Sequence, residues 1–210
     1  MTACTIELIT VTPFAQNCRL LGVPAQGKCL VCDPGGEAER ILQAADDAQL
    51  KIVAILLTHG HFDHTGAVNE LRETLGIPVY AHENSDRYLL DGEMNLSAFC
   101  IGEKVIRNVC TLRDGDTVSL RDGSCLLRVI HTPGHTTDSV VYYSEKDRVA
   151  FVGDTIFKGS IGNYQYPGGN RQELVESITG KIFALPDDTV LYSGHSGATT
   201  VRIEKNRYLG

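Results

Sequence analysis

The chain has 210 residues, enough to bury a large core, and we expect a single domain spanning residues 1–210. Its residues are 42% hydrophobic and 21% charged, as in ordinary globular proteins, and the formal net charge is −7. This acidic balance argues against nucleic acid and anionic membranes as partners. A small-molecule substrate stays open even if it is anionic, because bound metal reverses the local charge.

The N-terminal residues do not resemble a secretion signal, because they lack a basic segment and Glu7 interrupts their apolar run. We therefore expect a cytoplasmic protein. The odd number of cysteines, seven, favours reduced thiols over a disulfide framework. Cys29 and Cys32 have C-x-x-C spacing but lie in a strand-like run, where their side chains point to opposite faces. We interpret them as strand packing.

Short β-branched and apolar runs broken by proline and glycine predict the strands of the first half. These are Thr5–Val11, Asn17–Leu21, Lys28–Cys32, Ile52–Leu57 and Pro78–Ala81. One-sided apolar spacing predicts helices at Glu37–Ala48 and Ala67–Leu75. Residues 83–110 mix helix-like and loop-like patterns, so we expect an excursion from the sheet that shapes a pocket.

Strand patterns resume in the second half, with a hairpin turn expected at Asp122-Gly123. The predicted strands are Thr117–Leu120, Cys125–Ile130, Ser139–Tyr143, Arg148–Val152 and Thr189–Ser193. Leu174, Val175, Ile178 and Ile182 have the spacing of one buried helix face and predict a helix at Gln172–Ala184. Strands and helices in both halves indicate a layered α/β fold.

Four potential metal ligands stand within six residues directly after the apolar strand at Ile52–Leu57. They are His59, His61, Asp63 and His64. Alternate residues of an extended chain share a face, so the first two histidines can reach one metal, while the other two ligands can aim at a second. Imidazole and carboxylate donors suit zinc and also iron or manganese. Burying four such groups without a metal would be costly, so we interpret the segment as part of a metal site.

Four ligands do not complete two metal sites, and three later places supply candidates at strand ends. His131 and His135 follow one predicted strand, Asp154 the next, and His195 the last. Spacing alone does not decide between the first two histidines. His82 has no such partner, and we interpret it as a structural or pocket-rim residue.

Together, the segments Thr58–His64, Thr132–His135, Gly153–Thr155 and Gly194-His195 resemble the metallo-β-lactamase superfamily. The similarity is strongest to its glyoxalase II (hydroxyacylglutathione hydrolase) branch, in a short single-domain form. The resemblance implies a four-layer αββα sandwich built from two similar halves, with the site at one edge. The H-x-H-x-D-H motif is specific for the superfamily and only weakly specific for the substrate.

The resemblance also implies the roles of the site residues. The ligands of one metal would be His59, His61, His135 and Asp154, and those of the other Asp63, His64, His195 and the bridging Asp154. Asp33 and His131 would lie behind the ligands and orient their rings. The two ions, zinc by preference, would hold a bridging hydroxide as the nucleophile for a thioester carbonyl. Asp63 would handle protons if it is free of metal.

Several segments differ from the branch. Gly162–Gln165 and Gly194–Gly197 replace common family motifs. After His195 we expect no counterpart of the basic helical domain with which longer relatives hold glutathione. These differences remove no metal ligand but leave glutathione recognition open. Tyr164 and Tyr166 are candidates for the substrate pocket, with exposed loop tyrosines as the alternative.

Three functions therefore stay in competition. The first is a metal-dependent hydrolase of thioesters such as S-D-lactoylglutathione or another acyl thiol. The second is a persulfide dioxygenase with one iron, which keeps the same histidines. The third is a binding or sensor domain without catalysis, against which the complete ligand set argues. The motifs do not specify an oligomeric state.

Overall fold

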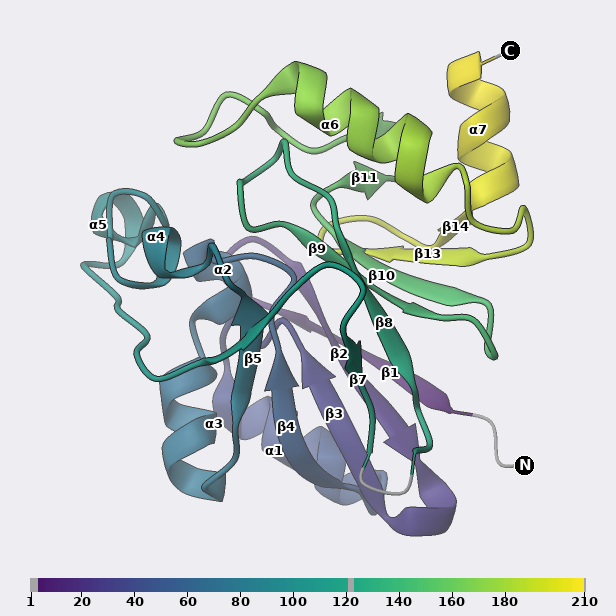
Figure 1. Ribbon diagram of the computed structural model, residues 1–210. Helices are drawn as coiled ribbons and strands as arrows, with labels where there is room; N and C mark the ends of the chain where they lie inside the picture. The colour runs from purple at the N-terminus through teal and green to yellow at the C-terminus, as the bar shows by residue number, and fades with distance from the viewer. Residues whose placement is uncertain (1–3, 121–122, 210) are drawn as a thin grey trace.

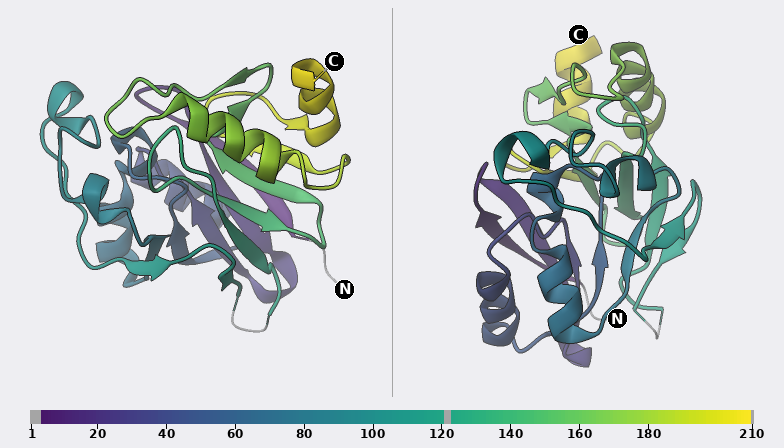
Figure 2. Two further views of the ribbon diagram at one scale, coloured as in Figure 1. Left: turned by 45° about the horizontal axis from the view of Figure 1, so that its top comes forward. Right: turned by 90° about the vertical axis from the view of Figure 1, so that its left-hand side faces the viewer.

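A computed structural model describes residues 4–120 and 123–209 of the chain. Two six-stranded sheets pack face to face, and helices cover the outer face of each (Figures 1 and 2). This is the predicted α/β sandwich with four layers in the order αββα. None of the helices in the described part is long and apolar enough to cross a bilayer.

The first sheet has the strand order β1-β2-β3-β4-β5-β6. Its strands are β1 (Thr5–Val11), β2 (Gln16–Val23), β3 (Lys28–Cys32), β4 (Lys51–Leu56), β5 (Val79–His82) and β6 (Cys110–Leu112). The first three strands are antiparallel, and β3 to β6 run parallel to one another. The helices that accompany this sheet are α1 (Ala38–Asp47), α2 (Phe62–Thr65), α3 (Val68–Leu75), α4 (Asp86–Leu89) and α5 (Ser97–Cys100).

The second sheet has the order β14-β13-β10-β9-β8-β7. Its strands are β7 (Thr117–Val118), β8 (Leu127–His131), β9 (Val140–Ser144), β10 (Val149–Gly153), β13 (Val190–Ser193) and β14 (Thr199–Thr200). A small hairpin of β11 (Ile156–Phe157) and β12 (Ser160–Ile161) follows β10. The outer helices are α6 (Arg171–Ser177), which continues as a π-helix over Ile178–Ile182, and α7 (Val201–Leu209).

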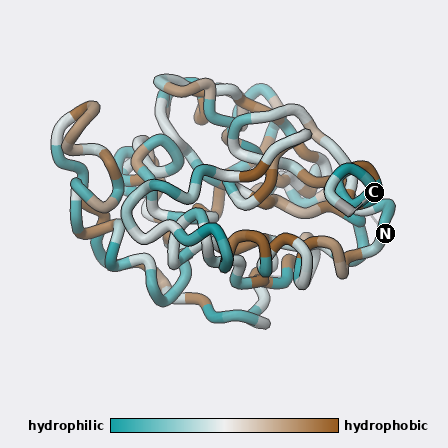
Figure 3. Tube along the Cα trace, turned by 90° about the horizontal axis from the view of Figure 1, so that it is seen from above, coloured by the Kyte–Doolittle hydropathy of each residue, from teal (hydrophilic) through white to brown (hydrophobic). Residues whose placement is uncertain are grey.

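Strand alternation divides the core into layers. On β2, which is buried on both faces, Leu20 packs toward α1 and α3, whereas Leu21 packs between the two sheets. The inter-sheet layer contains the fully buried Tyr142 and the nearly fully buried Phe151, and a third apolar cluster lies between the second sheet and α6. Each fully buried large side chain contributes roughly 1.5–3 kcal/mol to folding. In Figure 3, several hydrophobic stretches of the chain lie toward the middle of the trace.

Most predicted elements are present with shifted ends. β1 and β3 cover the predicted residues, whereas the strand predicted at Cys125–Ile130 begins later, as β8. The helix predicted at Gln172–Ala184 is present as α6 and the π-helix that continues it, with Leu174, Ile178 and Ile182 buried. The placing of Val175 on the same buried face is wrong, because this side chain is exposed. The hairpin predicted at Asp122-Gly123 falls partly outside the described residues. The sequence patterns did not predict β11, β12, β14 or α7.

All seven cysteines lie in the described part of the chain, and each is a free thiol. Cys29 belongs to the apolar cluster under α1 and α3, and Cys32 to the cluster between the sheets. The two side chains therefore point to opposite faces of β3, as the strand interpretation predicted. This arrangement separates them and excludes a shared metal or a mutual disulfide in this fold.

Candidate metal centre

The segment after β4 turns sharply and presents its polar side chains at one edge of the two sheets. His61 is in extended conformation just before α2, and the short helix then carries Asp63 and His64. Gly60 has no room for a side chain, because an added Cβ would lie 2.5 Å from the Tyr88 Cβ. The tight packing fixes the path of the loop between the two neighbouring histidines.

The second sheet contributes three more side chains, each from the loop after a strand and each preceded by glycine. Gly134, before His135, has φ +131°, and an added Cβ would lie 2.1 Å from the backbone nitrogen of Leu174. Gly194, before His195, would bring a Cβ to 2.3 Å from Asp154 Oδ1. Glycine is therefore required at both places for the loops to approach their neighbours.

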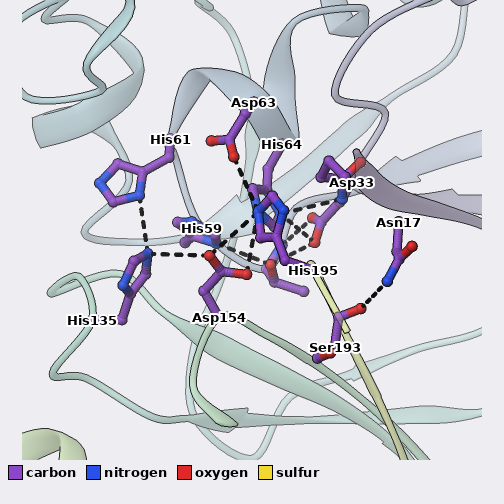
Figure 4. Close-up of polar contacts among 12 residues, drawn as sticks. Asn17, Asp33, His59, His61, Asp63, His64, His135, Asp154, Ser193 and His195 are labelled. Atoms are coloured by element: carbon purple, nitrogen blue, oxygen red, sulfur yellow. Dashed lines mark hydrogen bonds and ion pairs between the residues drawn. The ribbon is translucent and has the colours of Figure 1, made fainter. Parts of the chain in front are cut away.

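Seven predicted side chains meet in one histidine–aspartate cluster (Figure 4). They are His59, His61, Asp63, His64, His135, Asp154 and His195. They form three overlapping groups, and the potential ligand atoms of each group lie within 4.8 Å of one another. The cluster thus joins the loop after β4 to the loops after β8, β10 and β13.

Two ends of this cluster can be distinguished. At one end, His135 Nε2 is 3.0 Å from His61 Nδ1, and both rings pack against His59. At the other end, His195 Nε2 is 3.2 Å from His64 Nε2 and 3.1 Å from Asp63 Oδ2.

Asp154 lies between the two ends. Its carboxylate is 3.8 Å from His135 Nε2, 3.4 Å from His64 Nε2 and 3.5 Å from His195 Nε2. It is therefore the one carboxylate of the cluster within 4.0 Å of histidines at both ends. Its Oδ2 lies between His135 at one end and His195 at the other, and this is the position of a bridging carboxylate.

The ring nitrogens that point away from the cluster have partners on the surrounding loops. His64 Nδ1 is 3.0 Å from Asp33 Oδ2, His135 Nδ1 is 2.6 Å from the carbonyl of Asn163, and His195 Nδ1 is 3.2 Å from the carbonyl of Phe14. A carbonyl or carboxylate accepts a hydrogen bond from each of these nitrogens when Nδ1 carries the ring proton, and the other nitrogen, Nε2, then has a lone pair directed inward.

Asp33 also fixes the chain next to the cluster. Its carboxylate accepts hydrogen bonds from the backbone nitrogen of Thr58, at 2.7 Å, and from the Thr58 hydroxyl, at 2.6 Å. The side chain is buried with 3% exposure and therefore holds the loop after β4 and the His64 ring at the same time.

The inward atoms fit metal ions. The buried Nε2 of His59 and Oδ1 of Asp154 have no hydrogen-bond partner among the described residues. His61 Nδ1 and His135 Nε2 are 3.0 Å apart, so they either share one proton or present both lone pairs to a common cation. Buried polar atoms without partners are costly, and divalent ions that take nitrogen and oxygen donors satisfy all of them at once.

Burial and charge act differently at the two ends. Burial lowers the pKa of His61 to about 3, and that of His59 falls well below its ordinary value for the same reason. These imidazoles are neutral at pH 7, which is the form that binds metal. Burial also opposes the charged form of His64, but Asp154 and other nearby carboxylates outweigh it and raise that pKa well above its ordinary value. This end of the cluster favours positive charge, which a cation supplies.

Two of the predicted residues lie away from the cluster. His131 stacks on His82 with ring centroids 4.1 Å apart, and its Nε2 is 2.9 Å from the carbonyl of Thr137. Tyr164 packs against the apolar cluster under α6. Its neighbour Tyr166 does reach the centre, with ring centroids 5.7 Å from that of His61. His82 is buried, in agreement with a structural role.

A cavity of about 530 Å³ opens directly on the cluster. Several apolar residues that the sequence patterns did not single out line this cavity, among them Phe14, Leu96, Phe99 and Phe157. Leu96 and Phe99 come from the excursion at residues 83–110, as expected of that segment. Phe14 stands in the turn between β1 and β2 and Phe157 ends β11, and no local pattern marks them as pocket residues.

Comparison with known proteins agrees with the fold and the motifs. The family described as "Metallo-beta-lactamase superfamily" matches residues 11–195. Hydroxyacylglutathione hydrolase GloC from Haemophilus influenzae is 34% identical over 95% of this chain and 94% of its own.

Two solved structures extend the comparison. BLEG-1, a B3 metallo-beta-lactamase, superposes with a TM-score of 0.89 at 36% identity, over 96% of this chain and 97% of its own. TTHA1623 in a di-iron-bound form gives a TM-score of 0.81 at 33% identity, over 96% and 98%.

Proposed function

Because the chain belongs to the metallo-β-lactamase superfamily, we propose that it is a dinuclear metal-dependent hydrolase of thioesters such as S-D-lactoylglutathione or a related acyl thiol. We propose residues 1–210 as one domain. The observation that carries the proposal is the position of the Asp154 carboxylate within 4 Å of histidines at both ends of the cluster. A shared carboxylate keeps two cations close enough to act on one water. The 34% identity to the hydrolase GloC supports thioesters as the substrate class.

We assign the seven side chains to two ions with Asp154 shared. The first ion takes His59, His61 and His135, and the second takes Asp63, His64 and His195. When bound, such ions lower the pKa of a shared water from about 15.7 to roughly 7 and stabilise the negative charge that develops on the carbonyl oxygen. Zinc is the ion we propose, and the di-iron form of TTHA1623 makes iron the first alternative.

The residues around the ligands keep this geometry. Asp33, the carbonyl of Asn163 and the carbonyl of Phe14 hold the outward nitrogens of three histidines. The ligand nitrogens then need no reorganisation when the metal binds or when the substrate reacts.

Asp63 contacts His195 in the cluster and also lines the cavity. Burial would raise its pKa, but His64 and His195 outweigh burial and lower it. The carboxylate is therefore ionised at neutral pH. We assign it the acceptance of a proton during hydrolysis, in addition to any contact with the second ion. Thiolate is a good leaving group, so cleavage needs no separate acid.

The second candidate is a persulfide dioxygenase with one iron. The group of His59, His61 and His135 favours it, because three histidines are by themselves a sufficient set for one ion. The distinction between the two candidates lies in whether the other end of the cluster is also filled.

A metal count combined with activity assays tests the proposal. We expect two metal ions per chain and hydrolysis of S-D-lactoylglutathione or of simple acyl thiols. One iron per chain with oxygen uptake on glutathione persulfide would replace the proposal with the dioxygenase. Cleavage of a chromogenic cephalosporin without cleavage of any thioester would assign a β-lactam substrate, as the name of BLEG-1 suggests for that protein.

A further inference from the structure

The cavity next to the cluster has two unlike walls. One wall consists of the cluster itself, represented by His61, Asp63, His135, Asp154 and His195. The other wall is mainly hydrocarbon and is made by Phe14, Phe62, Leu96, Phe99, Phe157 and Tyr166. A substrate that reaches the cluster through this cavity lies against both walls.

The apolar wall continues up to the ligands. Phe14 packs edge to face on Phe62, with centroids 5.7 Å apart, and Phe157 approaches the ring of His195 at 6.3 Å. Tyr166 approaches His61 at 5.7 Å and His135 at 6.3 Å. The groups of a substrate that flank the reacting carbonyl therefore meet aromatic rings and not water.

Part of this wall is left uncovered by the rest of the chain. Phe99 is 70% exposed, and Phe14 is 54% exposed. When a ligand covers large exposed aromatic side chains beside a reactive centre, binding becomes more favourable in proportion to the apolar area removed from water. The occupant that gains most is one with a hydrocarbon surface.

The charged residues around the cavity also favour an occupant with a hydrocarbon surface. No lysine or arginine is among the described residues that line it, and its carboxylates, Asp63 and Asp154, belong to the cluster. Glutathione carries two carboxylates and an ammonium group, which would lose hydration on this wall without an ionic partner. An uncharged group loses less hydration free energy on this wall.

Resting on the proposed function, we propose that the substrates are thioesters whose groups next to the carbonyl are uncharged and apolar, such as medium-chain or aromatic acyl chains on a neutral thiol. The aromatic wall binds the chain, and the cluster receives the carbonyl. S-D-lactoylglutathione is then a poor substrate, because its lactoyl group is small and polar and its thiol is charged.

Matched substrates test the proposal with metal-loaded protein. Hexanoyl and acetyl thioesters of N-acetylcysteamine differ only in four methylenes, and a fully buried methylene is worth about fourfold in affinity. With partial burial we expect kcat/KM to favour the hexanoyl compound by at least about tenfold. With the acyl group held constant, the N-acetylcysteamine thioester should exceed the glutathione thioester.

Two variants locate the effect. Phe99→Ala removes an exposed ring of the wall, and we expect it to reduce the ratio of hexanoyl to acetyl kcat/KM by about threefold or more. Ile203→Ala removes an exposed apolar side chain of α7 outside the cavity, 50% exposed, and serves as the matched control with an unchanged ratio.

A binding readout without turnover uses two thiols of the chain. Cys100 lines the cavity and is exposed, whereas Cys110 is exposed but not among the residues that line it. The thioether S-hexyl-N-acetylcysteamine should slow alkylation of Cys100 and leave Cys110 unchanged, and S-hexylglutathione should protect less.

The outcomes separate the two proposals. Equal rates for hexanoyl and acetyl thioesters, or a preference for the glutathione thioester, would overturn the apolar substrate class and leave the thioester hydrolase in place. Loss of all thioester turnover together with unprotected Cys100 would overturn both.

Discussion

Histidine rings pack against one another in two places, and the surroundings of the two places differ. His82 and His131 stack nearly parallel, with an angle of 12° between their planes, and their polar contacts are to the backbone of Asn84 and Thr137. In the histidine–aspartate cluster the rings are equally close, for example 4.1 Å between His59 and His64. There, however, carboxylates lie within reach of the rings, and buried atoms such as His59 Nε2 and Asp154 Oδ1 have no hydrogen-bond partner among the described residues.

This contrast shows that crowded imidazoles do not by themselves make a metal site. In the stacked pair, His82 Nδ1 and His131 Nε2 each have a backbone hydrogen-bond partner, and neither ring has a buried nitrogen that lacks one. The cluster holds its outward nitrogens but leaves inward atoms such as His59 Nε2 and Asp154 Oδ1 without partners. The experiments below either remove this difference or measure it, beginning with the largest expected effect.

Removing one imidazole from each place gives the strongest comparison. We expect His61→Ala to lower thioester hydrolysis by more than the roughly 10- to 100-fold typical of residues behind metal ligands, because it deletes a ligand. His131→Ala should stay within a few fold of the wild type. Kinetics and metal content of both variants provide the measurement. Equal losses would contradict the distinction between the two places.

Metal removal should affect folding through the cluster alone. When free metal is about a thousandfold above its dissociation constant, binding stabilises the folded chain by about 4 kcal/mol. For a chain of this size, that corresponds to a melting temperature roughly 10 °C lower after chelation. Calorimetry with and without chelator measures it. The His61→Ala variant should show a smaller shift, and an equal shift would place the metal elsewhere.

The residues behind the histidines allow a finer comparison. Asp33 accepts from the His64 ring, and Asp114 accepts from the backbone nitrogen of His131 at 2.8 Å. We expect Asp33→Asn to weaken metal binding by about 10- to 100-fold and Asp114→Asn to leave it unchanged. Competition with a chelating dye measures both. A loss in the Asp114 variant, or none in the Asp33 variant, would refute the assignment.

The smallest expected effect concerns pH. Burial and the neighbouring His131 lower the pKa of His82 to about 4, against a pull upward from Glu83 and Asp114. Between pH 4 and 6.5 the unfolded chain therefore binds more protons than the folded chain, and stability rises with pH across this window. The loss toward pH 4 should be on the order of 1 kcal/mol.

Denaturant unfolding at several pH values tests this prediction. The control is His82→Gln, which lacks the titrating group and should show a flatter profile between pH 4 and 6.5 in metal-free protein. An identical slope in both proteins would assign the pH dependence to other groups.

The sequence predicted the first part of the site well and the second part incompletely. His59 to His64 stand together after an apolar strand, so composition and position were sufficient. Spacing left His131 and His135 open, since both follow the same strand. The structure separates them because β8 ends at His131 and the turn after it carries His135 to the cluster.

The regular spacing of apolar residues explains which helices and strands could be predicted from the sequence. Long strands and α1 have apolar spacing that a sequence displays directly. The strands β11, β12 and β14 are too short to display such spacing, and α7 is mostly polar. The local sequence therefore does not predict these four elements. The phenylalanines of the cavity come from a turn, from α2, from α5 and from β11, and only the tertiary fold brings them together.

The origin of the ligands in both sheets has a consequence for the order of folding. His59 and His195 lie far apart along the chain, and contacts of that kind form late because a long loop must close first. Neither sheet alone supplies the three histidines of the first group, since His135 belongs to the second sheet. Tight binding of metal therefore requires that both sheets have docked. The rate of metal uptake during refolding then measures how fast the whole chain completes its folding.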